Sequence, residues 1–168
     1  MVLYENDSQQ AGESLSPSGT QANTDPSFGS KDLQEAMALL PQEQHTLVLC
    51  WGDRRVTDTR RGIRPLLELL ESGSSFAPFS AADKVVGKAA AFLYLLLDVK
   101  EVYAQVISQP ALQVLTHRGI PTYYGTLVPA IRNRTDTGFC PMETAVWDIT
   151  DPQEALLRLK TTLQALSQ

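Results

Sequence analysis

One apolar segment of the chain has no polar face. The pattern of Ala81–Asp98 predicts a helix that organises the domain, because Ala89–Leu97 is apolar without a break, as in a helix buried on all sides. Asp83, Lys84 and Lys88 fall in the first two turns of this predicted helix. The lysines stand near the helix end whose dipole is positive, which is unfavourable, so we expect that end to carry chemistry.

Strands alternate with helices along the rest of the chain. His45–Trp51 is apolar on both faces, as a central strand is, and Gly52-Asp53 is a two-residue turn that starts a return strand, Arg54–Asp58. Further strands are predicted at Val99–Ser108 and Pro121–Leu127. The other predicted helices are Lys31–Leu40, Gly62–Glu71, Gln109–Arg118, a short one opening at Cys140–Glu143, and Asp151–Leu166. This order predicts an α/β fold, a three-layer α/β/α sandwich with a mixed sheet of four to five strands.

Composition divides the chain into a tail and one domain. Residues 5–30 are rich in Ser, Gln, Asn, Gly, Asp and Pro and have almost nothing to bury, so residues 1–30 are expected to be a disordered N-terminal tail. Residues 31–168 are expected to form one domain. With 43% hydrophobic and 20% charged residues, the chain has the composition of a soluble globular protein.

The net charge and the cysteine content indicate which partners and which cellular location to expect for the protein. A net charge of −5 disfavours nucleic acid and anionic membranes as partners. The arginines at 54, 55, 60, 61 and 64 are therefore interpreted as a solvated edge. Cys50 and Cys140 make no disulfide framework, which fits a reducing compartment. The N-terminus has no signal-peptide pattern and Ala89–Leu97 is too short to span a bilayer, so a cytoplasmic location is expected.

The order of helix, hairpin, buried helix, strand, helix and strand is similar to the cytidine-deaminase-like fold. In deaminases the buried helix after the hairpin carries a His-Ala-Glu type motif, and strand three runs into a Pro-Cys-x-x-Cys motif. The corresponding segments here look like Val86–Ala90 and Ser108–Val114, which keep the proline and lack both metal cysteines. The helix Gly62–Glu71 departs from the usual deaminase layout.

Two motifs resemble a narrower family. DKVVGKAAA (Asp83–Ala91) with NRTDTGFCPME (Asn133–Glu143) looks like the signature of an uncharacterised domain family that has the deaminase-like fold without its zinc site. The resemblance covers about residues 44–147 and implies no known activity.

The ligand inventory argues against zinc-dependent deamination. A catalytic zinc of this class needs one His or Cys, two Cys and a Glu. His45, His117, Cys50 and Cys140 are not at the required spacing, so no metal or cofactor is predicted.

Lys84 and Lys88 carry the first site hypothesis, with Asp83 and Gly87 beside them. Two cations and helix amides could converge on a carboxylate or phosphate, and Gly87 would allow a close approach. Burial would also lower a lysine pKa, so Lys88 could serve as a base or amine nucleophile. In the alternative, Asp83 only caps the helix and the lysines extend to water.

The second site hypothesis is based on Cys140. At the start of a helix a thiol can become a nucleophile or sulfur carrier, with Glu143, Lys88 or Arg134 nearby. Alternatively Cys140 is a small packing residue, and Glu143 completes the helix cap. The polar loop between Asn133 and Gly138, including Arg134, either grips the ligand that Lys88 faces or is a solvated turn.

Three functions follow from these residues. The first is a small-molecule site at a Lys88/Cys140 pocket, for an anionic or nucleobase- or nucleotide-like ligand, with Asp83, Lys84, Gly87, Asn133, Arg134, Gly138 and Glu143 as binding residues. The second is a non-catalytic regulatory or homo-oligomeric interaction domain. The third is thiol or sulfur transfer through Cys140. These residues are compatible with an enzyme and with a binding domain.

Overall fold

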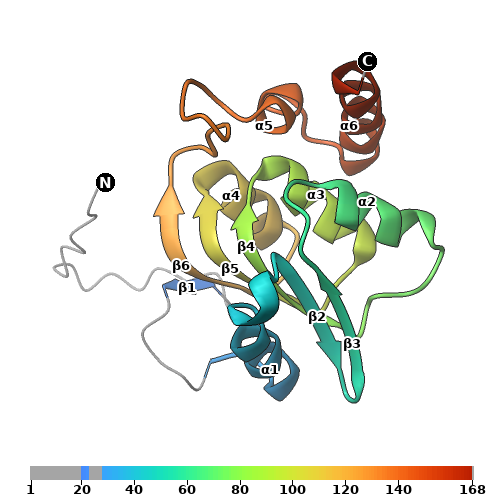
Figure 1. Ribbon diagram of the computed structural model, residues 1–168, viewed down its shortest axis with the longest axis vertical. Helices are drawn as coiled ribbons and strands as arrows, with labels where there is room; N and C mark the ends of the chain where they lie inside the picture. Colours follow the sequence, from blue (N-terminus) through green and yellow to red (C-terminus); the bar gives the residue numbers. More distant parts are fainter. Residues whose placement is uncertain (1–19, 23–27, 168) are drawn as a thin grey trace, which may run out of the picture.

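The computed structural model describes residues 20–22 and 28–167, and within these it contains one sheet and six α-helices (Figure 1). The strands are β1 (Thr20–Ala22), β2 (Leu47–Trp51), β3 (Arg54–Asp58), β4 (Ser80–Val86), β5 (Glu101–Ser108) and β6 (Thr122–Val128). The helices are α1 (Lys31–Leu39), α2 (Arg64–Glu71), α3 (Lys88–Leu97), α4 (Gln109–His117), α5 (Pro141–Ala145) and α6 (Pro152–Leu166), and a 3-10 turn, η1, spans Gln42–Gln44.

The sheet is mixed. Its strand order is β1-β6-β5-β4-β2-β3, in which β1, β6, β5 and β4 are parallel and β2 is antiparallel to both β4 and β3. The predicted α/β class with a mixed sheet is confirmed. Five strands lie between Leu47 and Val128, and Thr20–Ala22 adds a sixth where the sequence predicts disorder. Residues 1–19 and 23–27 of the predicted tail lie outside the described residues.

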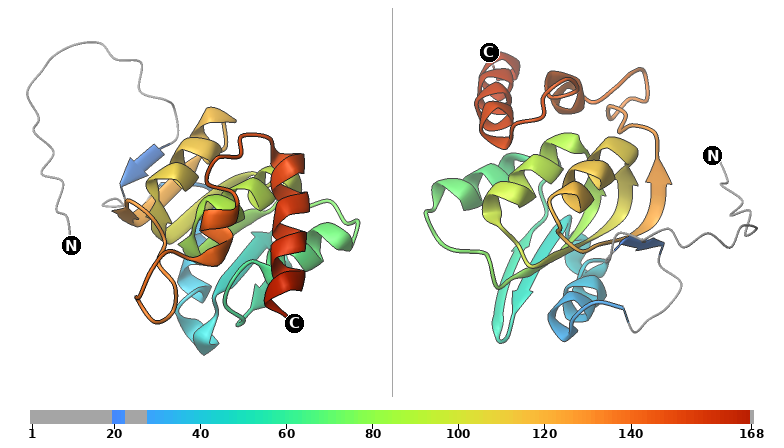
Figure 2. Two further views of the ribbon diagram at one scale, coloured as in Figure 1. Left: turned by 90° about the horizontal axis from the view of Figure 1, so that it is seen from above. Right: turned by 180° about the vertical axis from the view of Figure 1, so that it is seen from behind.

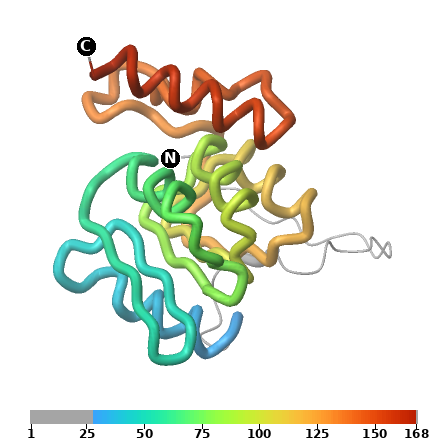
Figure 3. The backbone as a smooth tube through the Cα atoms, turned by 90° about the vertical axis from the view of Figure 1, so that its right-hand side faces the viewer, coloured from blue at the N-terminus to red at the C-terminus, as the bar shows by residue number. Residues whose placement is uncertain are grey.

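Helices lie on both faces of the sheet (Figure 2). Successive residues of β2 point to opposite faces, so Val48 and Cys50 pack with α1, whereas Leu47 and Leu49 join the larger core beneath α2, α3 and α4. Helix α6 contacts α3 from outside, with α5 beside it. The tube view shows α6 and the segment before it as an outer cover (Figure 3).

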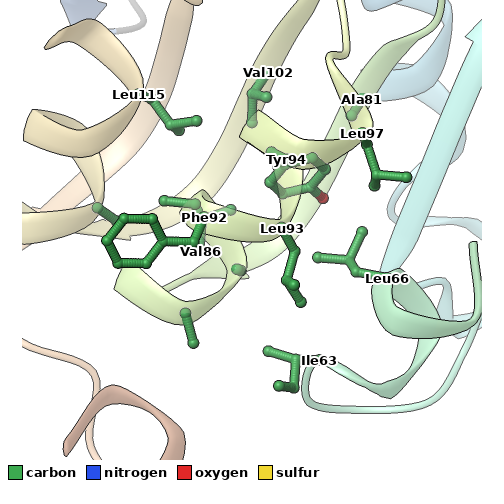
Figure 4. Close-up of a cluster of buried hydrophobic side chains, with 14 of the residues drawn as sticks. Ile63, Leu66, Ala81, Val86, Phe92, Leu93, Tyr94, Leu97, Val102 and Leu115 are labelled. Atoms are coloured by element: carbon green, nitrogen blue, oxygen red, sulfur yellow. The ribbon is translucent and has the colours of Figure 1, made fainter. Parts of the chain in front are cut away.

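Helix α3 is the centre of the larger core (Figure 4). All residues from Ala89 to Tyr94 are buried, as is Leu97. Each fully buried Phe or Leu contributes roughly 1.5–3 kcal/mol relative to an exposed side chain. The prediction that this apolar run is a buried helix is confirmed.

The predicted start of that helix at Ala81 is wrong. Residues Ser80–Val86 form strand β4, which pairs with β2 and β5, and the helix begins only at Lys88. Asp83 and Lys84 are therefore strand residues, and Asp83 does not cap a helix. The sequence Val86–Ala90 spans the end of β4 and the start of α3, whereas the helix that follows the hairpin is α2.

The other predicted elements begin within two residues of their expected starts. Ser30 caps α1 by accepting a hydrogen bond from the Leu33 amide at 3.2 Å, and Asp151 caps α6 in the same way from Glu154 at 2.8 Å. Gly52 has φ of 55° in the hairpin turn, which glycine adopts without strain. Among the described residues no helix has the length and apolar character needed to cross a membrane.

Candidate functional site

The candidate site lies at the carboxyl ends of strands β4 and β5, which we call the carboxyl edge of the sheet. Both strands run directly into helices, β4 into α3 after Gly87 and β5 into α4 without a gap, so the two helix N-termini meet at this edge (Figure 1). The carboxyl edge of parallel strands is where ligands bind in open α/β sheets. The loop after β6 brings α5 over the same edge.

Glu143 of α5 is the centre of this junction. Its side chain is 1% exposed, and its two oxygens bind groups distant in sequence. Oε2 accepts a hydrogen bond from the backbone N–H of Lys88 at 2.5 Å, and Oε1 accepts one from the Ser108 hydroxyl at 2.8 Å. Burial raises the pKa of Glu143, although both hydrogen bonds and the charge of Lys88 act in the opposite direction.

Gly87 is glycine because the Glu143 carboxylate lies against it. A Cβ atom at position 87 would collide with Oε2 of Glu143 and would come within 3.2 Å of Ile131 Cγ1. The backbone of Gly87 is extended, with φ of −91°, so the close approach and not the dihedral angle excludes a side chain. The predicted close approach at Gly87 is thus made by the chain's own carboxylate.

Lys88 extends from the start of α3 towards the turn after α5. Its ammonium group donates a hydrogen bond to the Trp147 carbonyl at 2.5 Å and lies 5.7 Å from the centroid of the Phe92 ring. Burial lowers the pKa of Lys88, while the nearby carboxylates of Glu143 and Asp148 raise it. The lysine is therefore a partly desolvated cation with free surface.

Two large aromatic side chains are exposed next to these groups. Phe139 is 60% exposed and Trp147 is 46% exposed, and their ring centroids are 6.3 Å apart. The Lys88 ammonium bonds the Trp147 backbone carbonyl, so the cation lies next to the residue that bears one of these rings. An exposed aromatic face can stack on a planar base, and a cation can bind a phosphate or carboxylate.

Cys140 is the N-cap residue of α5, one turn before Glu143. It is half-buried and packs against the core, while its backbone N–H donates to the Ile131 carbonyl at 3.0 Å. Neither histidine assists it. The ring of His45 bonds the Leu39 carbonyl beyond the other sheet face, and His117 is at the far end of α4 from Ser108.

The polar loop before α5 is bonded mainly to itself. The Asn133 amide donates to the Gly138 carbonyl at 2.9 Å, and the Asn133 side chain accepts from the Thr137 amide at 2.9 Å. Arg132 pairs with Asp136 inside the loop, and Arg134 is exposed. Asn133 and Gly138 thus shape the loop, and Arg134 is the residue whose side chain is free to reach a ligand.

Asp83 and Lys84 stand apart from the Glu143 junction. The Asp83 carboxylate accepts hydrogen bonds from the Tyr94 hydroxyl at 2.6 Å and from the Val85 amide at 3.1 Å. Burial raises the pKa of Asp83 to about 6, and these hydrogen bonds limit the rise. Lys84 is half-buried, and its backbone N–H donates to the Thr46 carbonyl at 3.0 Å. The described structure therefore groups Gly87, Lys88 and Glu143, and no hydrogen bond links Asp83 or Lys84 to them.

The domain family follows from the sequence comparison. The family described as a domain of unknown function, DUF1893, matches residues 35–163. The chain belongs to the DUF1893 family. It is similar to the crystal structure of a DUF1893 family protein from Thermotoga maritima, with 26% identity and a TM-score of 0.73 over 85% of this chain and 96% of that one. No curated protein matches the sequence.

Three residues of this DUF1893 domain that contribute to or flank the site were not predicted. Ser108 holds Glu143, Trp147 holds Lys88, and Tyr94 holds Asp83. Ser108 had a usable signal, because a serine followed by Gln-Pro at a strand end is a helix cap, and its side chain does accept from the Ala111 amide. Nothing in the sequence points to the Trp147 carbonyl or to the Tyr94 hydroxyl as partners.

A second buried carboxylate lies at the opposite end of the strands, where β5 begins. Glu101, 5% exposed, accepts hydrogen bonds from the Ser80 hydroxyl at 2.7 Å and from the Ser30 backbone at 3.2 Å. It anchors the start of α1 to β5. Within residues 28–167, no three His, Cys, Asp or Glu side chains are grouped so that they could hold a metal ion.

Proposed function

We propose that this DUF1893 domain binds a small anionic ligand of nucleobase- or nucleotide-like shape at the carboxyl edge of β4 and β5. The observation that carries the proposal is the hydrogen bond from the Lys88 ammonium to the Trp147 carbonyl, which places a partly desolvated cation beside a residue whose ring, like that of Phe139, is exposed. A cation binds a phosphate or carboxylate, and aromatic faces stack on a planar base. The two interactions together favour a ligand with both parts.

The neighbouring residues have distinct roles in this proposal. Glu143 positions the start of α3, from which Lys88 extends, because its carboxylate holds the Lys88 amide. Arg134, exposed on the loop, supplies a second cation at the rim. Cys140 forms part of the wall formed by α5 and its preceding loop. Asp83, Lys84 and Gly87 contribute to the support of β4 and α3 and not to direct ligand contacts.

We further propose that the scaffold is a three-layer, cytidine-deaminase-like sandwich without a zinc site. The support is the order of β3-β2-β4-β5-β6, with a hairpin on one side and three parallel strands on the other. In this alignment α2 takes the place of the deaminase motif helix, and Gly87-Lys88 takes the place of the Pro-Cys-x-x-Cys turn. The correspondence is thus shifted by one element from the one that the sequence suggests. A cytoplasmic location stays a prediction.

The two other functions have weaker support. Thiol chemistry at Cys140 needs a base, and both histidines lie at other places in the fold. A homo-oligomeric role is favoured by one observation, the exposure of Leu157 and Leu166 on α6, at 69% and 58%. An oligomer that forms with rising protein concentration, in a chain that gives no ligand response, would favour that role over the ligand site.

A panel of nucleosides, nucleoside monophosphates and inorganic phosphate tests the proposal. We expect a nucleoside monophosphate to raise the melting temperature and to quench tryptophan fluorescence more than its nucleoside does. Lys88→Ala should weaken binding by about tenfold or more, the loss expected for one charge-assisted contact. Lys100→Ala is the matched control, because Lys100 is exposed just before β5 at the opposite edge. An absent response, or an equal response in both variants, would contradict the proposed site.

A further inference from the structure

The segment between β6 and α6, residues 129–150, covers the site as a strap. Its loop part is bonded within itself, since Asn133 pairs with Gly138, Arg132 with Asp136, and the Cys140 amide with the Ile131 carbonyl. Its helical part is the single short helix α5. Internal bonding of this kind allows a segment to keep its shape when it moves.

The polar attachment of this strap to the sheet edge is concentrated at two residues. Glu143 contacts residues 55 and 35 positions away, the Lys88 amide and the Ser108 hydroxyl. The second attachment is the hydrogen bond from the Lys88 ammonium to the Trp147 carbonyl. Both attachments use Lys88, one through its backbone and one through its side chain. A substitution at Glu143 should therefore alter the position of Lys88 in the proposed ligand site.

The apolar attachment is smaller than the number of hydrophobic residues in the strap suggests. Met142, Val146 and Ile149 are buried, whereas the large rings of Phe139 and Trp147 are mainly exposed. Exposed rings contribute little to holding the strap closed. The carboxyl group of Glu143 is also desolvated, which raises its pKa and reduces the net gain from its hydrogen bonds.

We propose that Glu143 is a latch that holds the strap closed, and that the strap opens as one unit while the sheet and α3 stay folded. Opening exposes Cys140 and separates Trp147 from Lys88, so the latch keeps the two parts of the proposed ligand site together. The inference does not depend on the identity of the ligand, because opening occurs in the free protein.

The chain carries its own reporters for this motion. Cys140 lies on the strap, and Cys50 lies in β2 and is fully buried. Alkylation of each thiol in the ligand-free full-length chain, followed by peptide mass spectrometry, measures local and global opening separately. We expect Glu143→Ala to accelerate Cys140 labelling by about tenfold or more with a much smaller change at Cys50. Glu143→Gln, which keeps one acceptor oxygen, should give an intermediate rate.

Thr144→Ala is the matched control, since Thr144 is the next residue of α5, is exposed, and has a hydroxyl that donates to the Cys140 carbonyl within the same helix. Its labelling rates should equal those of the wild type within about twofold. Equally faster labelling of both cysteines in Glu143→Ala would mean that Glu143 supports the whole fold. Unchanged labelling of Cys140 would mean that Glu143 does not hold the strap closed. Either result overturns the proposal. If Glu143→Ala does not fold, hydrogen exchange of the wild type decides. Amides of α5 as protected as those of β5 would overturn it.

Discussion

At the scale of single residues, burial favours the neutral form of three titratable side chains on β4, α3 and α5. The pKa values of Asp83 and Glu143 are raised and that of Lys88 is lowered, each mainly by desolvation. Each group keeps hydrogen-bond partners that favour its charged form. Clusters of shifted pKa values are typical of functional sites, although structural ion pairs produce them too.

Asp83→Asn tests the burial of the Asp83 carboxylate. Because the pKa of Asp83 in the folded protein rises from its ordinary 3.8 to about 6, its contribution to stability is complete below pH 3.8 and is lost as pH rises through about 6. The free energy of unfolding of the wild type should therefore fall relative to that of the variant, by up to about 3 kcal/mol between pH 4 and pH 7. Urea denaturation of both proteins at the two pH values measures this. Parallel pH dependences would show that the carboxylate is solvated.

The sequence singled out three residues that the structure brings together, but it did not indicate their partners. Lys88, Gly87 and Glu143 were predicted because cations near a helix start and an acidic residue in a first turn are local patterns. Their contact joins residues 55 positions apart in sequence, which no local pattern reports. Asp83 and Lys84 were placed in the site because they precede Lys88 closely, and the strand geometry of β4 separates them from it.

At the scale of elements, the junction of β4 and α3 determines the site. The sequence Ala81–Val86 was predicted to begin a helix, since Ala81 and Ala82 favour helices and β-branched residues come only at its end. Pairing with β2 on one side and β5 on the other overrides that preference. A buried parallel strand and a buried helix both appear as apolar runs, so Gly87 was the available boundary signal.

A double-mutant cycle of Gly87→Ala and Glu143→Ala tests the close approach at this junction. The added Cβ should displace the Glu143 carboxylate and destabilise the protein by about 1–3 kcal/mol. In the Glu143→Ala background the same change should cost about 1 kcal/mol less, because the obstructing atoms are gone. Chemical denaturation of the four proteins gives the coupling energy. Identical costs in both backgrounds would place the Gly87 requirement elsewhere, at Ile131.

At the scale of the whole molecule, α6 covers the outer side of α3 and completes the burial of the central helix (Figure 3). Its amphipathic pattern was predicted with the right bounds and with Asp151 as the cap. The mixed sheet was also predicted, because strands that alternate with helices leave few possible arrangements. The pairing of β1 with β6 was not predicted, since the three polar or small residues Thr20–Ala22 show no strand pattern.

Leu159→Ala and Leu157→Ala compare the two sides of α6. Leu159 is fully buried and Leu157 is 69% exposed on the same helix. We expect Leu159→Ala to lower the free energy of unfolding by about 2–5 kcal/mol through the cavity that it leaves. Leu157→Ala should change it by less than about 0.5 kcal/mol. A large loss in the Leu157 variant, together with a change in oligomeric state, would show that this side of α6 is covered by a second copy.

The most direct test of the ligand site is a titration of the isotope-labelled chain with a nucleoside monophosphate, followed by amide NMR. The account predicts chemical-shift changes that cluster at the start of α3, near Lys88, and from Phe139 to Trp147, and that disappear in Lys88→Ala. The amides near Lys100 at the opposite edge should not shift. Shift changes that are absent, or that cluster away from Lys88 and Trp147, would contradict the account.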